Sequence, residues 1–146
     1  MSEYGDLVQA KCDALADRIV KLNDFLLEEA ANKKAEVLRL KADGKPVFKK
    51  PVPVYLQSVS AICNQLLRSG TSIGANNSEA TSAISKADYK AKSYIALKEA
   101  RESLYWIELL HRNGYLDEKQ YESIRNDCEE LVRILVSRCK KLDSEG

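Results

Sequence analysis

The sequence predicts an all-α protein that folds as an antiparallel up-down four-helix bundle. Only three prolines and six glycines interrupt 146 residues, of which 45% are hydrophobic and 31% are charged. Apolar residues recur at steps of three and four, the period of an amphipathic helix, and no alternating strand pattern is present. The length fits a single domain over residues 1–146, with enough chain to bury a core. The chain divides into four helical segments and one proline-rich loop.

The first helix is expected at about residues 6–42. Its apolar residues follow one another at steps of four and three: Val8, Cys12, Leu15, Ile19, Leu22 and Leu26. A helix of this length is unusual in a small domain. The segment therefore either runs unbroken to about residue 42 or breaks near Asn32.

The next segment, residues 43–53, is expected to be a loop because it holds all three prolines of the chain. Proline lacks an amide hydrogen and disfavours helix in the residue before it. Lys45, Lys49 and Lys50 surround Phe48 in this loop. These lysines could contact a polyanion, although a solvated loop is the favoured interpretation.

The second helix, at about residues 54–80, carries only two charged residues, Arg68 and Glu79. A helix that is uncharged nearly all round is expected to be buried on more than one side. Gly70, Gly74 and Ser78 are spaced four apart and form a stripe of small residues that lets two helix backbones approach closely. Each glycine costs about 1 kcal/mol of helix propensity, which close packing must offset. A phosphate-binding glycine loop is disfavoured, because its motifs and a preceding strand are missing.

The third helix is expected at about residues 82–113, with Gly114 as its C-terminal stop. Its helical spacing gives two apolar faces. The first face comprises Tyr89, Ala96, Leu97, Ala100, Leu104 and Ile107. The second face comprises Ile84, Ala87, Ala91, Ile95, Trp106 and Leu109. A monomeric bundle needs only one apolar face on each helix, so the second face predicts the interface of a homo-oligomer.

The fourth helix, at about residues 117–142, is expected to start at Asp117. This residue can cap the helix together with Gln120, three positions later. Its core face comprises Tyr121, Ile124, Cys128, Leu131, Leu135 and Leu142.

The charge balance limits the functions that the chain can have. Its 23 basic and 22 acidic residues give a formal net charge of +1, whereas a protein that covers nucleic acid over a large area is usually strongly basic. Lys90, Arg101 and Arg112 nevertheless fall on one strip of the third helix, which Glu108 dilutes. This strip is a weak candidate nucleic-acid site, and a solvated strip is the simpler interpretation.

Few residues are available for catalysis or metal binding. His111 is the single histidine, so its pair with Glu108 cannot be repeated to build a di-metal site. It is expected to be a hydrogen-bonded residue of the core or its rim. The four cysteines form no C-x-x-C pair and are expected to be small buried hydrophobes in a reducing cytoplasm. They are Cys12, Cys63, Cys128 and Cys139.

We therefore expect no enzymatic activity, metal, cofactor or small-molecule substrate. No apolar run of about 18 residues and no signal-peptide pattern is present, so the expected location is the cytoplasm, without a membrane partner.

Two long blocks resemble a known family. Residues 65–80, QLLRSGTSIGANNSEA, and residues 85–110, SKADYKAKSYIALKEARESLYWIELL, are similar to the hallmark blocks of the 23S rRNA intervening-sequence proteins, which are small bacterial four-helix bundles. A related branch, the accessory variability determinant of diversity-generating retroelements, works with a reverse transcriptase and nucleic acid. The resemblance implies a homopentameric barrel, no catalytic residues, and nucleic-acid binding through basic surface residues. It assigns a helix-packing motif to Arg68, Gly70, Gly74, Asn76 and Glu79.

The sequence departs from the family pattern in two places. A longer charged extension over residues 29–53 could alter a partner surface. Asn77 stands where family members typically carry an apolar residue. An unsatisfied buried amide costs about 1–3 kcal/mol, so Asn76 or Asn77 is expected to bond to a facing helix or to Glu79.

The sequence leaves two functions to be distinguished. The first is a non-enzymatic homo-oligomer, pentameric by resemblance, that binds RNA, DNA or a ribonucleoprotein partner. The alternative is a protein–protein interaction scaffold with no nucleic-acid role, which the near-neutral charge and the second apolar face favour.

Overall fold

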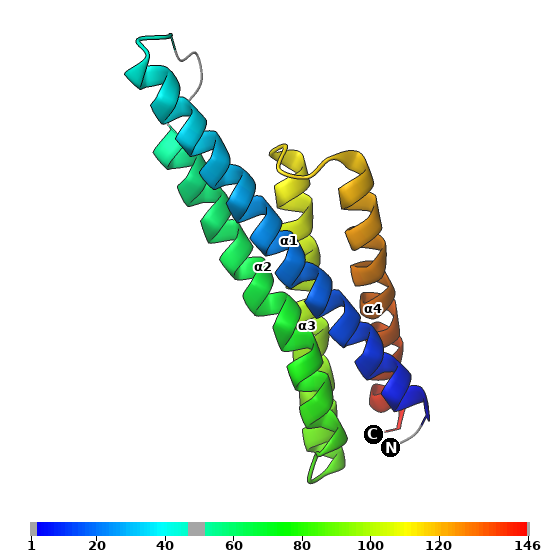
Figure 1. The fold of residues 1–146 in the computed structure, drawn as a ribbon. Coiled ribbons are helices and arrows are strands. Elements are labelled where there is room, and N and C mark those ends of the chain that lie inside the picture. The colour runs from blue at the N-terminus through cyan, green and yellow to red at the C-terminus, as the bar shows by residue number, and fades with distance from the viewer. Residues whose placement is uncertain (1–2, 47–51, 146) are drawn as a thin grey trace.

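The computed structural model describes residues 3–46 and 52–145 of the chain. Within these residues it contains four α-helices and no strand, which confirms the all-α prediction. Successive helices run in opposite directions, and the two termini lie at the same end of the molecule (Figure 1). The helices are α1 Glu3–Ala42, α2 Val52–Thr81, α3 Lys86–Arg112 and α4 Glu118–Ser144.

The first helix is continuous, so the alternative of a break near Asn32 is wrong. The helix ends at Ala42 and is followed by Gly44, which has a φ of +66° that residues with a side chain rarely adopt. The amides of Gly44 and Lys45 donate to the carbonyls of Lys41 and Leu40 at 3.1 and 2.9 Å. These two bonds form a Schellman motif, which satisfies carbonyls that the helix end would leave unpaired.

The proline-rich loop is shorter than predicted, because α2 already begins at Val52. Pro53 therefore lies in the first turn of a helix, where its missing amide hydrogen costs no hydrogen bond. Residues 47–51, which include Phe48, Lys49 and Lys50, lie outside the described residues.

The third helix begins at Lys86 and not near Ser82. Ser85 is its N-cap, with extended backbone angles, and its hydroxyl accepts a 3.1 Å hydrogen bond from the amide of Asp88. The Asp88 carboxylate in turn accepts from the amide of Ile84 at 3.2 Å. Ile84 therefore lies in the turn before α3. The prediction that it lies on the helix is wrong.

The predicted end of the third helix and the predicted start of the fourth are confirmed. Gly114 follows α3 with a φ of +75°. Asp117 and Gln120 form a reciprocal capping box at the start of α4, with hydrogen bonds of 2.8 and 3.0 Å.

The core lies between the four helices, and α2 packs along both α1 and α3, as its lack of charge predicts. Gly70 and Gly74 face α1, which confirms the close approach predicted for them. A Cβ atom at Gly70 would overlap the side chain of Ile19, and one at Gly74 would lie 3.4 Å from the Cβ of Cys12. All four cysteines are buried and free, as predicted.

One end of the α1–α2 hairpin projects beyond the ends of the other two helices (Figure 1). The cause is a difference in length, because α1 has 40 residues whereas α3 and α4 have 27 each. The last buried residue of α1 is Ala30, and the first described buried residue of α2 is Val59. We call residues 31–46 and 52–58 the arm, and residues 3–30 and 59–145 the body.

Candidate interaction surfaces

The second apolar face of α3 points away from the core of the chain. The first face supplies buried residues such as Ala96, Ala100 and Ile107. The second face lies on the opposite side of the helix and is only partly covered by the chain itself. Its members are the exposed Ile84, Ala87, Ala91 and Ile95 and the half-buried Trp106 and Leu109.

Ile84 precedes the helix but is 95% exposed, and Ile95 is 38% exposed. We call these six residues the α3 outer face. In a single copy of the chain, this surface leaves large apolar side chains in contact with water.

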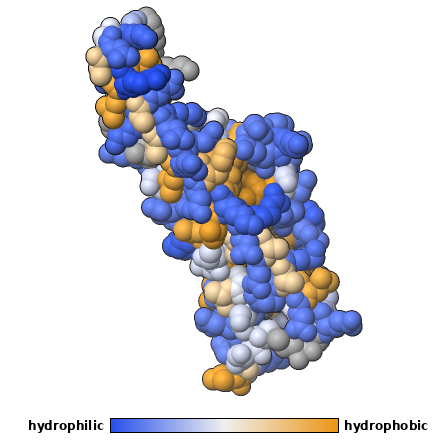
Figure 2. Space-filling model, in the orientation of Figure 1, coloured by the Kyte–Doolittle hydropathy of each residue, from blue (hydrophilic) through white to orange (hydrophobic). Residues whose placement is uncertain are grey.

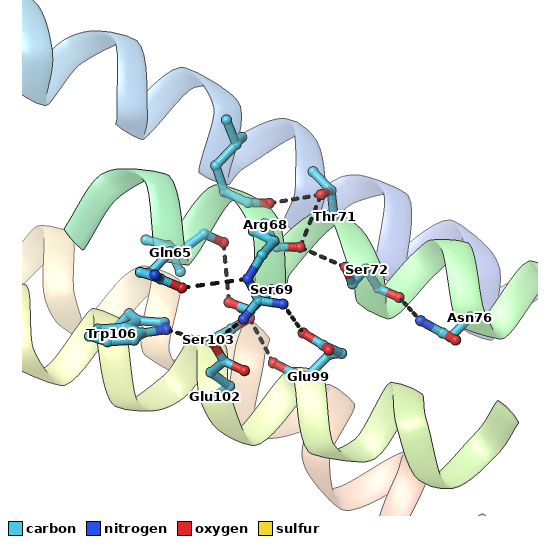
Figure 3. Close-up of polar contacts among 12 residues, drawn as sticks. Gln65, Arg68, Ser69, Thr71, Ser72, Asn76, Glu99, Glu102, Ser103 and Trp106 are labelled. Carbon is cyan, nitrogen blue, oxygen red and sulfur yellow. Dashed lines mark hydrogen bonds and ion pairs between the residues drawn. The ribbon is translucent and has the colours of Figure 1, made fainter. Parts of the chain in front are cut away.

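A cluster of polar contacts along the seam between α2 and α3 borders this face (Figure 3). The Arg68 guanidinium reaches two carboxylates of α3: Glu99 at 3.4 Å and Glu102. The indole nitrogen of Trp106 also donates to Glu102, at 3.1 Å. These hydrogen bonds, with that of Arg68 the larger contributor, hold the pKa of Glu102 below its ordinary value.

Glu102 lies on the α3 outer face itself, seven residues from both Ile95 and Leu109. The two carboxylates are thus already paired with Arg68 where a neighbouring surface would approach. Deeper in the seam, the Ser103 hydroxyl donates to the Ser69 hydroxyl at 2.9 Å. Both serines are fully buried, and their small side chains let the two helices lie close together. Glu79, the remaining charge of α2, pairs with Lys92 of α3.

The basic strip on α3 is partly neutralised by α4. Lys90 forms an ion pair with Asp143 at 2.9 Å, and the Tyr94 hydroxyl donates to the same carboxylate at 2.6 Å. The Tyr94 hydrogen bond first, and Lys90 second, lower the pKa of Asp143. Arg101 and Arg112 are exposed, and neither forms an ion pair with any residue in the described part of the chain. Two of the three predicted cations therefore remain free for a ligand.

A polar cluster around the buried Asn77 joins all four helices at the end of the body opposite the arm. Asn77 is 1% exposed; its amide nitrogen donates to Gln9 of α1 at 2.7 Å, and its oxygen accepts from Arg138 of α4 at 2.7 Å. The Arg138 guanidinium lies over the ring of Tyr89 of α3, 5.9 Å from its centre. The expectation of a bond to a facing helix is confirmed for Asn77. Asn76 instead donates to the carbonyl of Ser72 in its own helix, at 2.9 Å.

Sequence reasoning missed the partners Gln9 and Arg138. They lie 68 and 61 positions from Asn77 in the sequence, so no local pattern joins them. The departure of Asn77 from the family pattern was the available signal, because a buried amide must find donors and acceptors nearby.

His111 has a structural role in this chain. Its ring stacks on Tyr121 at 3.9 Å, and its Nε2 lies 2.9 Å from the carboxylate of Glu118. Over residues 3–46 and 52–145, no three metal-binding side chains come together in one group.

The cysteine thiols are poor nucleophiles. Burial raises the pKa of Cys12 and Cys63 to about 11 and that of Cys128 to about 12. At neutral pH these thiols are protonated, and the thiol is much less reactive than the thiolate.

None of the helices in the described part of the chain combines the length and apolar character needed to cross a lipid bilayer.

These features define an all-α helical bundle with an outward-facing apolar helix face and paired charges along its seams. The model of the 23S rRNA-intervening sequence protein family matches residues 54–137, which is more than half of the chain. The chain belongs to this family.

A solved structure supports the assignment. A protein with unknown function from the S23 ribosomal protein family of Bacteroides thetaiotaomicron is 39% identical to the chain. The match covers 93% of this chain and 97% of that one, with a TM-score of 0.68. No curated protein matches the chain.

Proposed function

We propose that the protein is a non-enzymatic homo-oligomer whose copies associate through the α3 outer face and whose assembly binds RNA or DNA. The observation that carries the proposal is that face itself. It combines exposed apolar side chains with two carboxylates, Glu99 and Glu102, that Arg68 has already paired, which lowers the cost of covering the face with a second apolar surface. The resemblance to the family favours five copies.

Substitution of Ile95 tests the assembly step. Ile95→Glu places a charge in the centre of the α3 outer face and is expected to dissociate the oligomer, because an unpaired charge is costly to bury. Leu38→Glu is the matched control, since Leu38 is 57% exposed but lies on the arm. Light scattering gives the mass of each variant in multiples of the 16.4 kDa chain. A wild-type protein that has the mass of one chain would contradict the proposal.

Arg101 and Arg112 support the nucleic-acid step, because both are exposed and lack a carboxylate partner among the described residues. In a ring of copies, this modest pair of cations would be repeated by symmetry. The family name links its members to 23S rRNA, which favours RNA as the first probe.

Retention on an RNA or DNA column at increasing salt tests this step. The double variant Arg101→Glu/Arg112→Glu is expected to elute at lower salt than the wild type, because fewer phosphates are neutralised. Lys119→Glu/Lys140→Glu changes the charge equally at exposed positions of α4 and serves as control. Equal retention of both variants would show that Arg101 and Arg112 do not contribute specifically to binding.

The alternative function is a protein–protein interaction scaffold with no nucleic-acid role. The formal net charge of +1 favours it, together with the pairing of Lys90 by Asp143. Co-purification of one specific protein partner without nucleic acid is the result expected of a scaffold.

A further inference from the structure

The arm has a higher net positive charge than the rest of the chain. Residues 31–46 contain five basic and two acidic side chains, and residues 52–58 contain no charged side chain. Their net charge of +3 exceeds the +1 of the whole chain, so the remainder is net acidic. Hydrophilic residues cover most of the visible surface of the arm (Figure 2). The five basic residues are Lys33, Lys34, Arg39, Lys41 and Lys45.

The cations of the arm differ from those of the body in their partners. In the body, carboxylates of neighbouring helices pair with many of the cations, such as Lys11, bound to Glu130 at 2.9 Å, and Lys90. Other cations of the body, such as Arg101 and Arg112, form no ion pair with a described residue. In the arm, Lys34, Arg39 and Lys41 are exposed and form no ion pair with any described residue. The difference arises because α3 and α4, which supply most carboxylate partners in the body, end before the arm begins (Figure 1).

Distance keeps the two charge distributions apart. Lys41 lies eleven residues beyond Ala30, the last buried residue of α1, which corresponds to about 16 Å along the helix. The Debye length at physiological ionic strength is about 8 Å. The acidic body therefore does not cancel the field of the cations at the tip of the arm.

The polarity of the helix accounts for only some of these cations. Basic side chains in the last turn stabilise the negative end of a helix dipole, and Arg39 and Lys41 lie there. Lys34 is seven residues before Lys41, two turns further from the helix end and on the same face. A dipole effect fades within one turn, so it gives no reason for a cation at Lys34.

We propose that the arm binds the phosphate backbone of nucleic acid, as a second contact surface separate from Arg101 and Arg112 on α3. This inference rests on the proposed function and adds to it the region of the chain that makes contact. Lys34 and Lys41 lie on one side of this exposed helix and Arg39 on another, an arrangement that can neutralise phosphates without reading bases. Binding through the arm is therefore independent of sequence.

Removal of three charges from the arm tests the proposal. The variant Lys34→Gln/Arg39→Gln/Lys41→Gln is compared with Lys21→Gln/Lys119→Gln/Lys140→Gln, which removes the same charge from exposed lysines of the body that have no ion pair within residues 3–46 and 52–145. Affinity for an RNA duplex and a DNA duplex of equal length is measured by fluorescence anisotropy over a range of salt concentrations. Vesicles that contain anionic lipid are the third probe.

The arm variant is expected to bind duplex at least about ten-fold more weakly at low salt. Its slope of log affinity against log salt should fall by about 2–3, because each lost phosphate contact contributes about 0.9. The body variant should keep the wild-type slope. Circular dichroism of both variants checks that the helices are intact.

The outcomes separate this inference from the proposed function. If the wild type binds neither duplex, both are overturned. If the wild type binds and the arm variant keeps the same slope, the arm proposal is overturned while the proposed function stands. An equal loss in both variants, or arm-dependent binding to vesicles alone, also overturns it.

Discussion

The arm and the body are two regions of one protein that share the same long helix but are built on different principles. In the body, α1 places buried residues from Val8 to Ala30 against α2 and α4. In the arm, the same helix continues for twelve more residues with none of them buried. Helix continuity therefore does not require a continuous core. The body is held by burial and by ion pairs between its helices, whereas Lys34, Arg39 and Lys41 of the arm form no ion pair with any described residue.

Truncation of apolar side chains gives the largest expected contrast between the two regions. Leu135→Ala removes a side chain that is 0% exposed and is expected to cost about 2–5 kcal/mol of unfolding free energy. Leu38→Ala removes one that is 57% exposed and should change stability by about 0.5 kcal/mol or less. Urea denaturation at constant protein concentration measures both. A large loss for Leu38→Ala would show that the arm is packed against a partner.

The buried polar cluster gives an intermediate effect, confined to the body. Arg138→Met removes the donor to the Asn77 oxygen, and the buried acceptor left behind is expected to cost about 1–3 kcal/mol. Arg133→Met is the control, because Arg133 is 69% exposed and its contact with Glu129 is long, at 3.9 Å. The double variant Asn77→Leu/Arg138→Met should recover part of the loss, because the unpaired Asn77 oxygen is removed. The recovery is incomplete, because Gln9 loses the hydrogen bond that Asn77 donates to it. Additive losses in the double variant would contradict the coupling.

Removal of the Glu102 charge, at the seam near Arg68, gives the smallest expected effect on stability. It is visible only as a change in how stability depends on pH. The pKa of Glu102 is lowered in the folded protein, so its contribution to stability is present above the pKa of the unfolded carboxyl, about 4.3. That contribution is lost as the pH falls through the folded pKa. Glu102→Gln should therefore flatten the fall in thermal stability between neutral and acidic pH. Glu36→Gln in the arm is the control, and an identical flattening there would assign the effect to general charge.

Local patterns in the sequence account for much of this architecture. Helical spacing distinguishes the buried face of α3 from its outer face. Asp117 predicts the start of α4, and Gly114 predicts the end of α3. The start of α3 could also have been predicted, because Ser85 and Asp88 have the spacing of a helix cap.

Contacts between helices could not be predicted in the same way. Spacing placed Lys90 on one strip with Arg101 and Arg112, but the pairing of Lys90 depends on which turn of α4 lies beside it. The partners of Asn77 likewise depend on the relative positions of three helices. The spacing of residues along one helix predicts which of its faces is buried. The register between helices results from packing of the whole core.

The arm has a further consequence for the way this protein opens. A pair of helices without a third or fourth to cover it buries little apolar surface, so it separates at a lower free energy than the whole fold. The amides of residues 31–42 are therefore expected to exchange with deuterium through local opening, well before those of residues 8–30 in the same helix. A single α-helix would then contain two exchange regimes that meet near Ala30, and a polyanion that orders the arm would slow only the faster one.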